Sequence, residues 1–300
     1  MHTANTLSEL HTARAHLSGR VAFVPTMGNL HAGHMSLVER GLQLADQVIV
    51  SIFVNPLQFG PNEDLDAYPR TLEADLAQLE AAGTALVFTP TPAVMYPDGL
   101  PAHARVSVPG LTDVLCGASR PGHFDGVTTV VCKLLNLIAA DIALFGEKDL
   151  QQLLIIKKMV NDLAIPVDIQ SVPTARAADG LALSSRNGYL SAAERDSAPL
   201  LQQQLRWIAD QLKSTSTSVS TLCEQAKNCL VAGGFEPDYL EARCRSDLRL
   251  ANDSDTDIAI FAAAKLGKTR LIDNIQVDRE PADRSQSRPG LGPGLTHLTC

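Results

Sequence analysis

Short runs of apolar residues alternate with longer segments of helical spacing through the first half of this 300-residue chain. The short runs predict buried strands, and the longer segments predict amphipathic helices. Strands that alternate with helices are joined by right-handed crossovers, which produces a mostly parallel sheet with helices on both faces. In chain order, we expect strands at 21–24, 48–54, 85–88, 141–145 and 167–172, and helices at 33–45, 72–82, 126–139 and 150–163.

The pattern changes after about residue 175. Two alanine- and glutamine-rich segments with helical spacing, 192–212 and 219–232, flank a Ser/Thr-rich stretch. Shorter strand-like runs follow them, and this order predicts a smaller α+β domain. The expected strands of this second domain are 239–243, 258–263 and 270–275.

The end of the chain, 279–300, is rich in Pro, Gly, Ser and Arg and shows little apolar periodicity. Such a composition is typical of a disordered tail. The sequence therefore predicts an α/β protein, with a Rossmann-like parallel-sheet domain at 1–175 and a smaller α+β C-terminal domain at 176–278.

A polar turn directly follows the strand expected at 21–24. It reads Pro-Thr-Met-Gly-Asn-Leu-His-Ala-Gly-His over 25–34 and leads into the next expected helix. Because the first N–H groups of a helix lack intrahelical partners and lie at the positive end of its dipole, we expect them to face an anion. His31 and His34 add two donors, and Gly33 lets a ligand approach the backbone closely. We interpret this turn as a nucleotide-binding and catalytic site; the alternative is that the two imidazoles only cap the helix.

Two further polar segments belong with this turn. Phe-Gly-Glu-Lys-Asp at 145–149 separates a strand from a helix, and Leu-Ser-Ser-Arg-Asn at 183–187 is a loop with two hydroxyls and one guanidinium. In parallel sheets, ligands bind beyond the carboxyl ends of the strands, so the turns that follow residues 24, 54 and 145 should cluster. Together these groups are suited to clamp a triphosphate.

Composition narrows the class of protein. The chain carries 25 basic and 33 acidic residues, a net charge of −8, so an overall nucleic-acid-binding surface is not expected. The six cysteines form no CxxC pair, which argues against a zinc or redox motif. We find neither a signal peptide nor a membrane-spanning apolar run, and we expect a cytoplasmic protein.

Six segments carry a specific resemblance. They are 25–34, Phe-Val-Asn-Pro-Leu-Gln-Phe (53–59), Tyr-Pro-Arg-Thr (68–71), Arg-Pro-Gly-His-Phe (120–124), 145–149 and 183–187. In this order, they closely resemble the pantothenate synthetase (pantoate–β-alanine ligase) family, and the resemblance runs from about residue 21 to about residue 275. His-Ala-Gly-His at 31–34 is similar to the HIGH-type signature of the wider nucleotidyltransferase superfamily. Ser-Ser-Arg at 184–186 occupies the place of the KMSKS-like phosphate loop of that superfamily.

The resemblance implies a two-step ligation, in which pantoate is activated by ATP as pantoyl adenylate and β-alanine then displaces AMP to give pantothenate. It implies that the first domain binds ATP and pantoate and that the second acts as a lid. By resemblance, His34 is a proton donor, although stabilisation of the phosphates by both histidines is at least as important. The implied ATP contacts are Met27, Gly28, Asn29, Leu30, His31, Ala32, Gly33, His34, Gly146, Glu147, Lys148, Asp149, Ala175, Leu183, Ser184, Ser185 and Arg186. The residues expected to be catalytic are His34, His31, Lys148, Ser184, Ser185 and Arg186.

The acyl substrates need amide groups rather than charges. By resemblance, Gln58 and Gln152 bind the pantoate hydroxyls, and Gln58 also adjoins the β-alanine site. Mg²⁺ should accompany ATP, held mainly by phosphates and water, with Asp149 as the first candidate carboxylate. The resemblance also implies a homodimer.

Two other functions stay open from the sequence. A plain nucleotidyltransferase would share the histidine turn but gives no reason for Gln58 and Gln152. A non-catalytic nucleotide-binding module would be expected to lack at least one of His34, Lys148 and Arg186, whereas all three are present. Release of AMP that depends on β-alanine separates the ligase from both alternatives.

Overall fold

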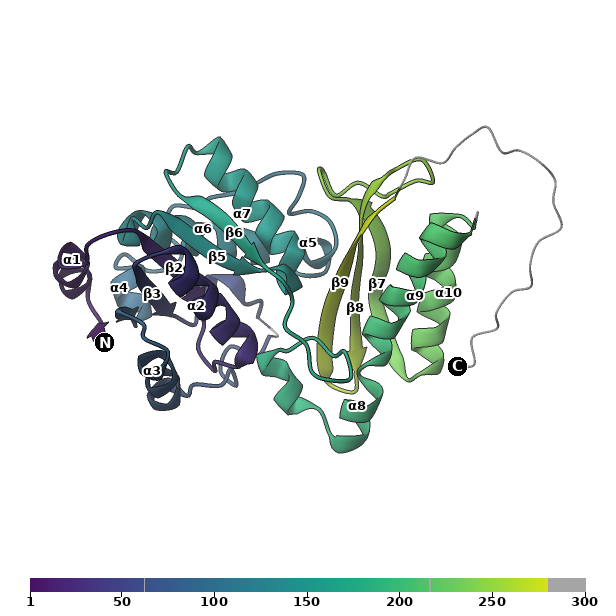
Figure 1. Cartoon of the computed structure of the whole chain (residues 1–300), viewed down its shortest axis with the longest axis horizontal. Helices are drawn as coiled ribbons and strands as arrows, with labels where there is room; N and C mark the ends of the chain where they lie inside the picture. Colours follow the sequence, from purple (N-terminus) through teal and green to yellow (C-terminus); the bar gives the residue numbers. More distant parts are fainter. Residues whose placement is uncertain (62, 216, 280–300) are drawn as a thin grey trace. The chain divides into compact units, whose positions relative to one another are not determined.

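The computed structural model describes residues 1–61, 63–215 and 217–279 (Figure 1). The predicted disordered tail lies, apart from its first residue, outside the described residues. The chain divides into two compact units. Unit 1 comprises residues 1–178 and 182–185, and unit 2 comprises residues 179–181 and the chain from Arg186 onward. The domain limits given by composition, 1–175 and 176–278, stay a prediction.

Unit 1 contains a six-stranded sheet in which all the strand pairings are parallel, as predicted. The strands are β1 (His2–Ala4), β2 (Val21–Thr26), β3 (Gln47–Ile52), β4 (Leu86–Phe88), β5 (Ile142–Gly146) and β6 (Asp168–Val172). They lie in the order β1-β4-β3-β2-β5-β6. The chain moves from β2 outward to β3 on one side and later to β5 on the other, so the strand order reverses between β2 and β5. In α/β sheets, ligands bind beyond the carboxyl ends of the strands at such a switch point.

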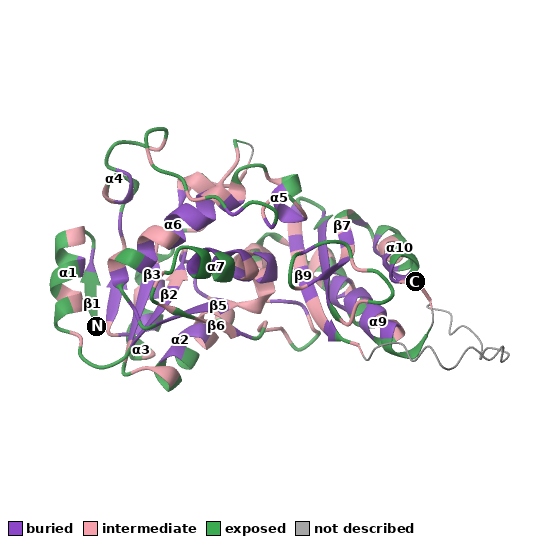
Figure 2. Cartoon of the chain, turned by 90° about the horizontal axis from the view of Figure 1, so that it is seen from above, coloured by how far each residue is buried: buried purple, intermediate pink, exposed green. Residues whose placement is uncertain are grey.

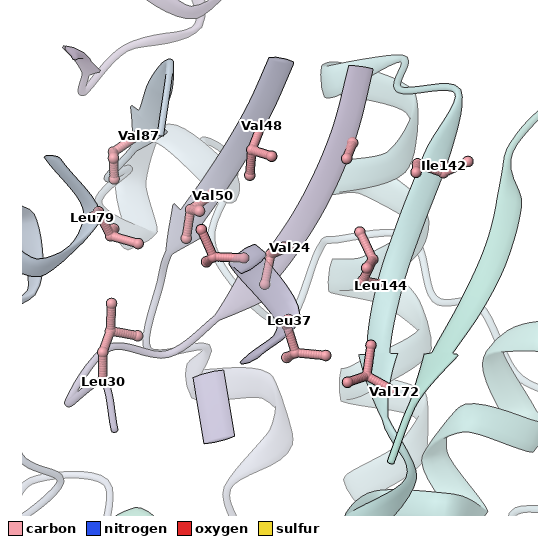
Figure 3. Close-up of a cluster of buried hydrophobic side chains, with 12 residues drawn as sticks. Val24, Leu30, Leu37, Val48, Val50, Leu79, Val87, Ile142, Leu144 and Val172 are labelled. Atoms are coloured by element: carbon pink, nitrogen blue, oxygen red, sulfur yellow. The ribbon is translucent and has the colours of Figure 1, made fainter. Parts of the chain in front are cut away.

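The helices of unit 1 are α1 (Leu7–Ala15), α2 (Ala32–Leu44), α3 (Leu72–Ala81), α4 (Pro92–Met95), α5 (Cys116–Ser119), α6 (His123–Ile138) and α7 (Leu150–Asp162). Alternate strand residues such as Val24, Val50 and Val87 form one buried cluster with Leu37 of α2 and Leu79 of α3 (Figure 3). The intervening residues, such as Phe23, are equally buried, and α6 and α7 contact β2 and β5. Because both faces are covered, the central strands β2, β3 and β5 are buried along most of their length (Figure 2).

Unit 2 contains an antiparallel sheet in the order β7-β8-β9, and helices of the same unit pack against it. Its strands are β7 (Phe235–Cys244), β8 (Asp257–Leu266) and β9 (Thr269–Asp278), and its helices are α8 (Ala192–Ser197), α9 (Leu200–Ser214) and α10 (Val219–Ala232). The single helix predicted at 192–212 is wrong, because the chain breaks between α8 and α9. Pro199 is the N-cap residue of α9. Proline has no N–H to donate and its ring clashes with the preceding turn, which prevents one continuous helix.

Candidate active site

The turn between β2 and α2, which we call the histidine turn (Met27–His34), begins with two residues of left-handed backbone. Gly28 has φ +82° and Asn29 has φ +50°. The N–H of Gly28 donates to Oγ1 of Thr26 at 3.2 Å. The N–H groups of Asn29 and Leu30 donate to the two carboxylate oxygens of Asp75, at 2.9 and 2.8 Å. These three N–H groups therefore bond within the protein, and the predicted ATP contacts of Gly28, Asn29 and Leu30 stay predictions.

His31 and His34 cap the N-terminus of α2. Nδ1 of His31 accepts the N–H of Gly33 at 3.1 Å, and Nδ1 of His34 accepts the N–H of His31 at 3.4 Å. A ring nitrogen that accepts carries no proton, so each neutral ring holds its proton on Nε2. The capping alternative is thus confirmed for Nδ1, and it leaves each Nε2–H as a donor on the opposite side of the ring.

Gly33 is required by this arrangement. A Cβ at this position would lie 2.8 Å from Cε1 of His31, which is closer than side-chain carbons approach. The same Cβ would lie 3.8 Å from Cβ of Ala175, so this predicted ATP-contact residue lies beside the histidine turn. The carbonyl of Ala175 in turn accepts the N–H of Leu183 at 2.9 Å. Gly33 therefore makes room for the ring of His31.

Both rings are neutral at pH 7. Burial, helped by the nearby His31 and Lys148, lowers the pKa of His34 to about 3. Burial and the positive charge of Lys148 also lower the pKa of His31, while the carboxylate of Asp149 acts in the opposite direction. The rings lie 4.1 Å apart between centroids. Each neutral ring therefore keeps one Nε2–H to donate, and the two rings lie side by side.

The second predicted segment lies at the same end of the sheet. β5 ends at Gly146, and a 3-10 helix (Glu147–Asp149) leads straight into α7. Because β5 pairs with β2, this turn lies next to the histidine turn, and the charges of Lys148 and Asp149 act on both imidazoles. Nζ of Lys148 lies 3.7 Å from Oδ1 of Asp149. The predicted convergence of these two segments is confirmed.

The third segment is divided between the units. Leu183, Ser184 and Ser185 belong to unit 1, and Oγ of Ser185 lies 3.5 Å from the carbonyl oxygen of Asn29 in the histidine turn. Arg186 belongs to unit 2, and its predicted phosphate contact stays a prediction.

Gln58 is oriented by a buried amide that follows β3. Nδ2 of Asn55 donates to the carbonyl of Gly126 and to Oε1 of Gln58, each at 3.1 Å. Oδ1 of Asn55 accepts the N–H of Leu57 and the hydroxyl of Tyr96, at 3.2 and 2.7 Å. A carbonyl only accepts and an N–H only donates, so the backbone fixes which way the Asn55 amide faces.

Once Asn55 is fixed, Gln58 is fixed as well. Its Oε1 faces Asn55, so its Nε2 faces away and lies 3.1 Å from Sδ of Met27. A Cβ on Gly126 would overlap the carbonyl oxygen of Leu57, so glycine allows α6 to approach the Gln58 segment. Gln152, the second predicted pantoate contact, lies partly buried on the first turn of α7.

A charged cluster holds the backbone of Gln58 from the other side. Nδ1 of His123 lies 2.8 Å from the carbonyl oxygen of Gln58, and Nε2 of His123 lies 2.9 Å from Nη1 of Arg120. Arg120 also forms a two-pronged ion pair with Glu63, at 2.7 and 2.5 Å. Burial, together with Arg120, lowers the pKa of His123 to about 4. His123 is therefore neutral at pH 7 and donates from Nδ1.

No role for Asp75, Asn55 or Tyr96 follows from the sequence motifs. Asp75 could have been noticed in the sequence. It shares a helix face with Leu72, Leu76 and Leu79, where helical spacing predicts an apolar residue. Asn55 lies inside one of the recognised segments. Tyr96 left no signal, since only the folded chain brings its hydroxyl to Asn55.

No helix in the described part of the chain combines the length and hydropathy that a membrane span requires. No three His, Cys, Asp or Glu side chains among the described residues form a group suited to hold a metal ion.

A family model and two curated relatives indicate the same family for this chain. A family model described as pantoate-beta-alanine ligase matches residues 1–276. The pantothenate synthetase of Shewanella baltica (strain OS195) is 59% identical over 259 residues, which cover 86% of this chain and 92% of the relative. That of Shewanella oneidensis is 57% identical with the same coverage.

Solved structures agree with the sequence comparison. Pantothenate synthetase from Thermus thermophilus shares 45% identity and a TM-score of 0.87, and the match covers 93% of this chain and 100% of that chain. A pantoate-beta-alanine ligase from Francisella tularensis, solved in complex with beta-gamma ATP and beta-alanine, shares 36% identity and a TM-score of 0.77. That match covers 92% of this chain and 97% of the other. The fold, the segments around the histidine turn and these matches together place the chain in the pantoate–β-alanine ligase family.

Proposed function

We propose that the histidine turn of unit 1 is the site where this chain condenses pantoate with β-alanine, using ATP and releasing AMP and pyrophosphate. The observation that carries the proposal is the pair of histidines at the start of α2, beside the switch point of the sheet, with both Nδ1 atoms engaged in capping. Family membership supplies the substrates, and the Francisella tularensis relative was solved with beta-gamma ATP and beta-alanine.

The first step joins two anions. A carboxylate oxygen of pantoate attacks the α-phosphorus of ATP, and the bond to the β-phosphate breaks to release pyrophosphate. Negative charge grows on the phosphate oxygens, so fixed donors are needed where it develops. His31, His34 and Lys148 supply these donors, and the loop residues Ser184, Ser185 and Arg186 bind the phosphates that leave.

His34 acts mainly as a hydrogen-bond donor. With its pKa lowered to about 3, the ring carries one proton, on Nε2, before ATP binds. An approaching phosphate raises the pKa of an imidazole, but a second proton on this ring would have to sit on Nδ1, which already accepts the N–H of His31. Stabilisation of the α-phosphate by Nε2–H therefore accounts for the role of His34 without a transferred proton.

In the second step, the amine of β-alanine attacks the acyl carbon of the adenylate. The C–O bond to phosphate breaks, AMP leaves with the bridging oxygen, and the amine loses a proton as the amide forms. By family resemblance, Gln58 binds the pantoate hydroxyls and adjoins β-alanine. Its amide is held ready for this role by Asn55, which turns the amide nitrogen toward Met27. Gln152 supplies the second amide for pantoate.

The residues present fit a Mg²⁺ ion that arrives with ATP rather than one held by the protein alone. Mg²⁺ binds through one or two carboxylates together with substrate phosphates and water. Asp149, at 45% side-chain exposure beside Lys148, is the carboxylate suited to this. When bound, the ion neutralises phosphate charge and orients the leaving pyrophosphate.

We further propose that the chain works as a cytoplasmic homodimer, as the resemblance implies. Sedimentation equilibrium at micromolar concentration measures the assembly directly. The mass of a dimer is the expected result, and the mass of a single chain at all concentrations would contradict it.

Omission of one component at a time tests the activity. Purified protein is incubated with ATP, Mg²⁺, pantoate and β-alanine, and AMP and pyrophosphate are quantified. AMP release that requires both pantoate and β-alanine supports the ligase. Pyrophosphate without AMP when both pantoate and β-alanine are present would instead favour a plain nucleotidyltransferase, and ATP binding without either product would favour a non-catalytic module. The variant His34→Ala, prepared in the same way, controls for contaminating enzymes.

A further inference from the structure

The backbone N–H groups of the histidine turn bind a carboxylate of the protein itself, that of Asp75. Successive N–H groups that follow left-handed residues converge on one point and bind anions. In this turn the N–H groups of Asn29 and Leu30 converge on the carboxylate of Asp75, at 2.9 and 2.8 Å. Asp75 lies on the first turn of α3, more than forty residues away in sequence, and it is 1% exposed.

The carboxylate fits its position closely. The hydroxyl of Thr71 donates to Oδ1 at 3.2 Å, so three donors share the two oxygens. A Cβ on Gly28 would lie 3.1 Å from Oδ2, a tight contact, at a φ of +82° that already favours glycine. Within the part of the chain that the structure describes, each of these partners is an uncharged donor. A buried carboxylate with such partners is tolerated only because the hydrogen bonds replace its hydration.

These bonds determine where α2 begins. Leu30 directly precedes His31, the N-cap residue, and Asn29 keeps a left-handed φ of +50° that residues other than glycine rarely adopt. Because Asp75 holds both N–H groups, it fixes the backbone from which the two imidazoles project. A small displacement of groups that contact a reacting phosphate lowers rates strongly.

We propose that Asp75 is a positioning residue for the nucleotide-dependent step, acting through the backbone of the histidine turn. The proposal rests on the proposed function, because it assigns the ATP site to His31 and His34. It takes the N–H groups of Asn29 and Leu30 to hold the turn in place, while other groups of the turn bind the ligand.

The test compares Asp75→Asn with Glu73→Gln. Both substitutions replace a carboxylate by an amide on the first turn of α3, but Glu73 is exposed. The amide introduced by Asp75→Asn would present an NH₂ group toward a backbone N–H, so one of the two bonds is lost. We expect kcat/KM for ATP to fall at least about 10-fold in Asp75→Asn, with KM for pantoate within about 2-fold of the unchanged protein. Glu73→Gln should leave both constants unchanged.

Amide hydrogen exchange on folded protein supplies a second readout. Exchange at Asn29 and Leu30 should be faster in Asp75→Asn than in Glu73→Gln. The milder variant Thr71→Val removes one donor from the carboxylate and should shift kcat/KM for ATP in the same direction by about 2- to 5-fold. Thr71→Val provides the test of the proposal if Asp75→Asn does not fold.

Three results would overturn the proposal while leaving the proposed function in place. They are unchanged ATP constants in a folded Asp75→Asn, unchanged ATP constants in Thr71→Val, or equal losses for ATP and pantoate that follow a fall in melting temperature. If the unsubstituted protein releases no AMP with both acids present, the proposed function itself has failed, and that result is seen before any variant is compared.

Discussion

The two units stabilise their polar side chains in different ways. In unit 1, polar groups near the ends of β2 and β3 bind to backbone atoms, as Asp75 does with the N–H groups of Asn29 and Leu30. Asn55 likewise bonds to the backbone of Leu57 and Gly126. In unit 2, charged side chains bind mainly to one another near the surface. Examples are the pairs Arg245–Asp257, Arg245–Asp278, Arg249–Asp255 and Arg270–Asp238.

This difference indicates where substitutions matter. A buried polar group that bonds to the backbone fixes the course of the chain, and its loss leaves an unpaired donor or acceptor. An exposed ion pair contributes little, because solvent screens both charges and two side chains must be ordered. We therefore expect activity to depend on the first kind of contact and to be indifferent to the second.

The largest effect is expected at His34. Removing one donor aimed at developing charge costs about 10²–10³ in rate, so His34→Ala should lower kcat by that factor and change the Kd for ATP by less than about 5-fold. Presteady-state release of pyrophosphate, with a separate ATP-binding titration, measures both quantities. His34→Gln places an amide N–H near the position of Nε2 and should recover part of the rate. A loss of ATP affinity equal to the loss of rate would contradict the assignment.

Acid should destabilise unit 1 through His34 and His123. Their pKa values of about 3 and about 4 lie below the ordinary histidine value, so the folded state binds fewer protons than the unfolded state as the pH falls below 6.5. Stability present at pH 7 is lost on acidification, by about 1–2 kcal/mol for each histidine at pH 5. Urea unfolding at a series of pH values measures this loss.

The variant His123→Asn sharpens the acid prediction. An asparagine amide can replace the Nδ1–H donor toward the carbonyl of Gln58 but does not titrate. We expect its stability to fall less between pH 7 and pH 5 than that of the unchanged protein. An identical fall in both proteins would show that His123 is not shielded from protons.

A smaller effect is expected at Tyr96. Tyr96→Phe removes the hydroxyl bond to Oδ1 of Asn55 but keeps the ring, so the orientation of Asn55 and then of Gln58 becomes less strictly fixed. One hydrogen bond is worth about 1 kcal/mol, which predicts a rise of about 5-fold in KM for pantoate. The KM for ATP should not change. Tyr239→Phe on β7 is the matched control, and equal changes in the two variants would refute the link to Gln58.

The smallest effect is expected in unit 2. Asp278 is 82% exposed on its side chain and pairs with Arg245. Asp278→Asn should change the free energy of unfolding by less than about 1 kcal/mol and leave kcat unchanged. Thermal unfolding and steady-state kinetics check both, and a marked loss of activity would contradict the contrast between the units.

Much of the fold followed from apolar periodicity. The strands β2 to β6 and the helices α2, α3, α6 and α7 begin and end within three residues of the expected positions, because burial on both faces produces long apolar runs. β1 and α1 were not predicted, since β1 has three residues and Leu10 is the one buried residue of α1. The capping box of Thr6 and Glu9 at the start of α1 was a local signal that could have identified this helix.

The candidate site was predictable where its residues are adjacent in sequence. His31 and His34, and the turn with Lys148 and Asp149, were found in this way. Their partners were not. The sequence marks Asp75 as a polar residue at an apolar helical position, but only the packing of distant elements brings Asp75 and Tyr96 to the site. The two imidazoles also illustrate a limit of sequence reasoning, since a capping role and a ligand role were treated as alternatives although Nδ1 and Nε2 can perform one each.

The central claim is that pantoate is activated on the α-phosphate of ATP. Pantoate labelled with ¹⁸O in its carboxylate, incubated with the protein, ATP, Mg²⁺ and β-alanine, tests it in one reaction. The account predicts that mass spectrometry finds one ¹⁸O atom transferred to AMP for each pantothenate formed, because AMP leaves with the bridging oxygen of the adenylate. Label in inorganic phosphate with formation of ADP would show activation at the γ-phosphate and would contradict the account.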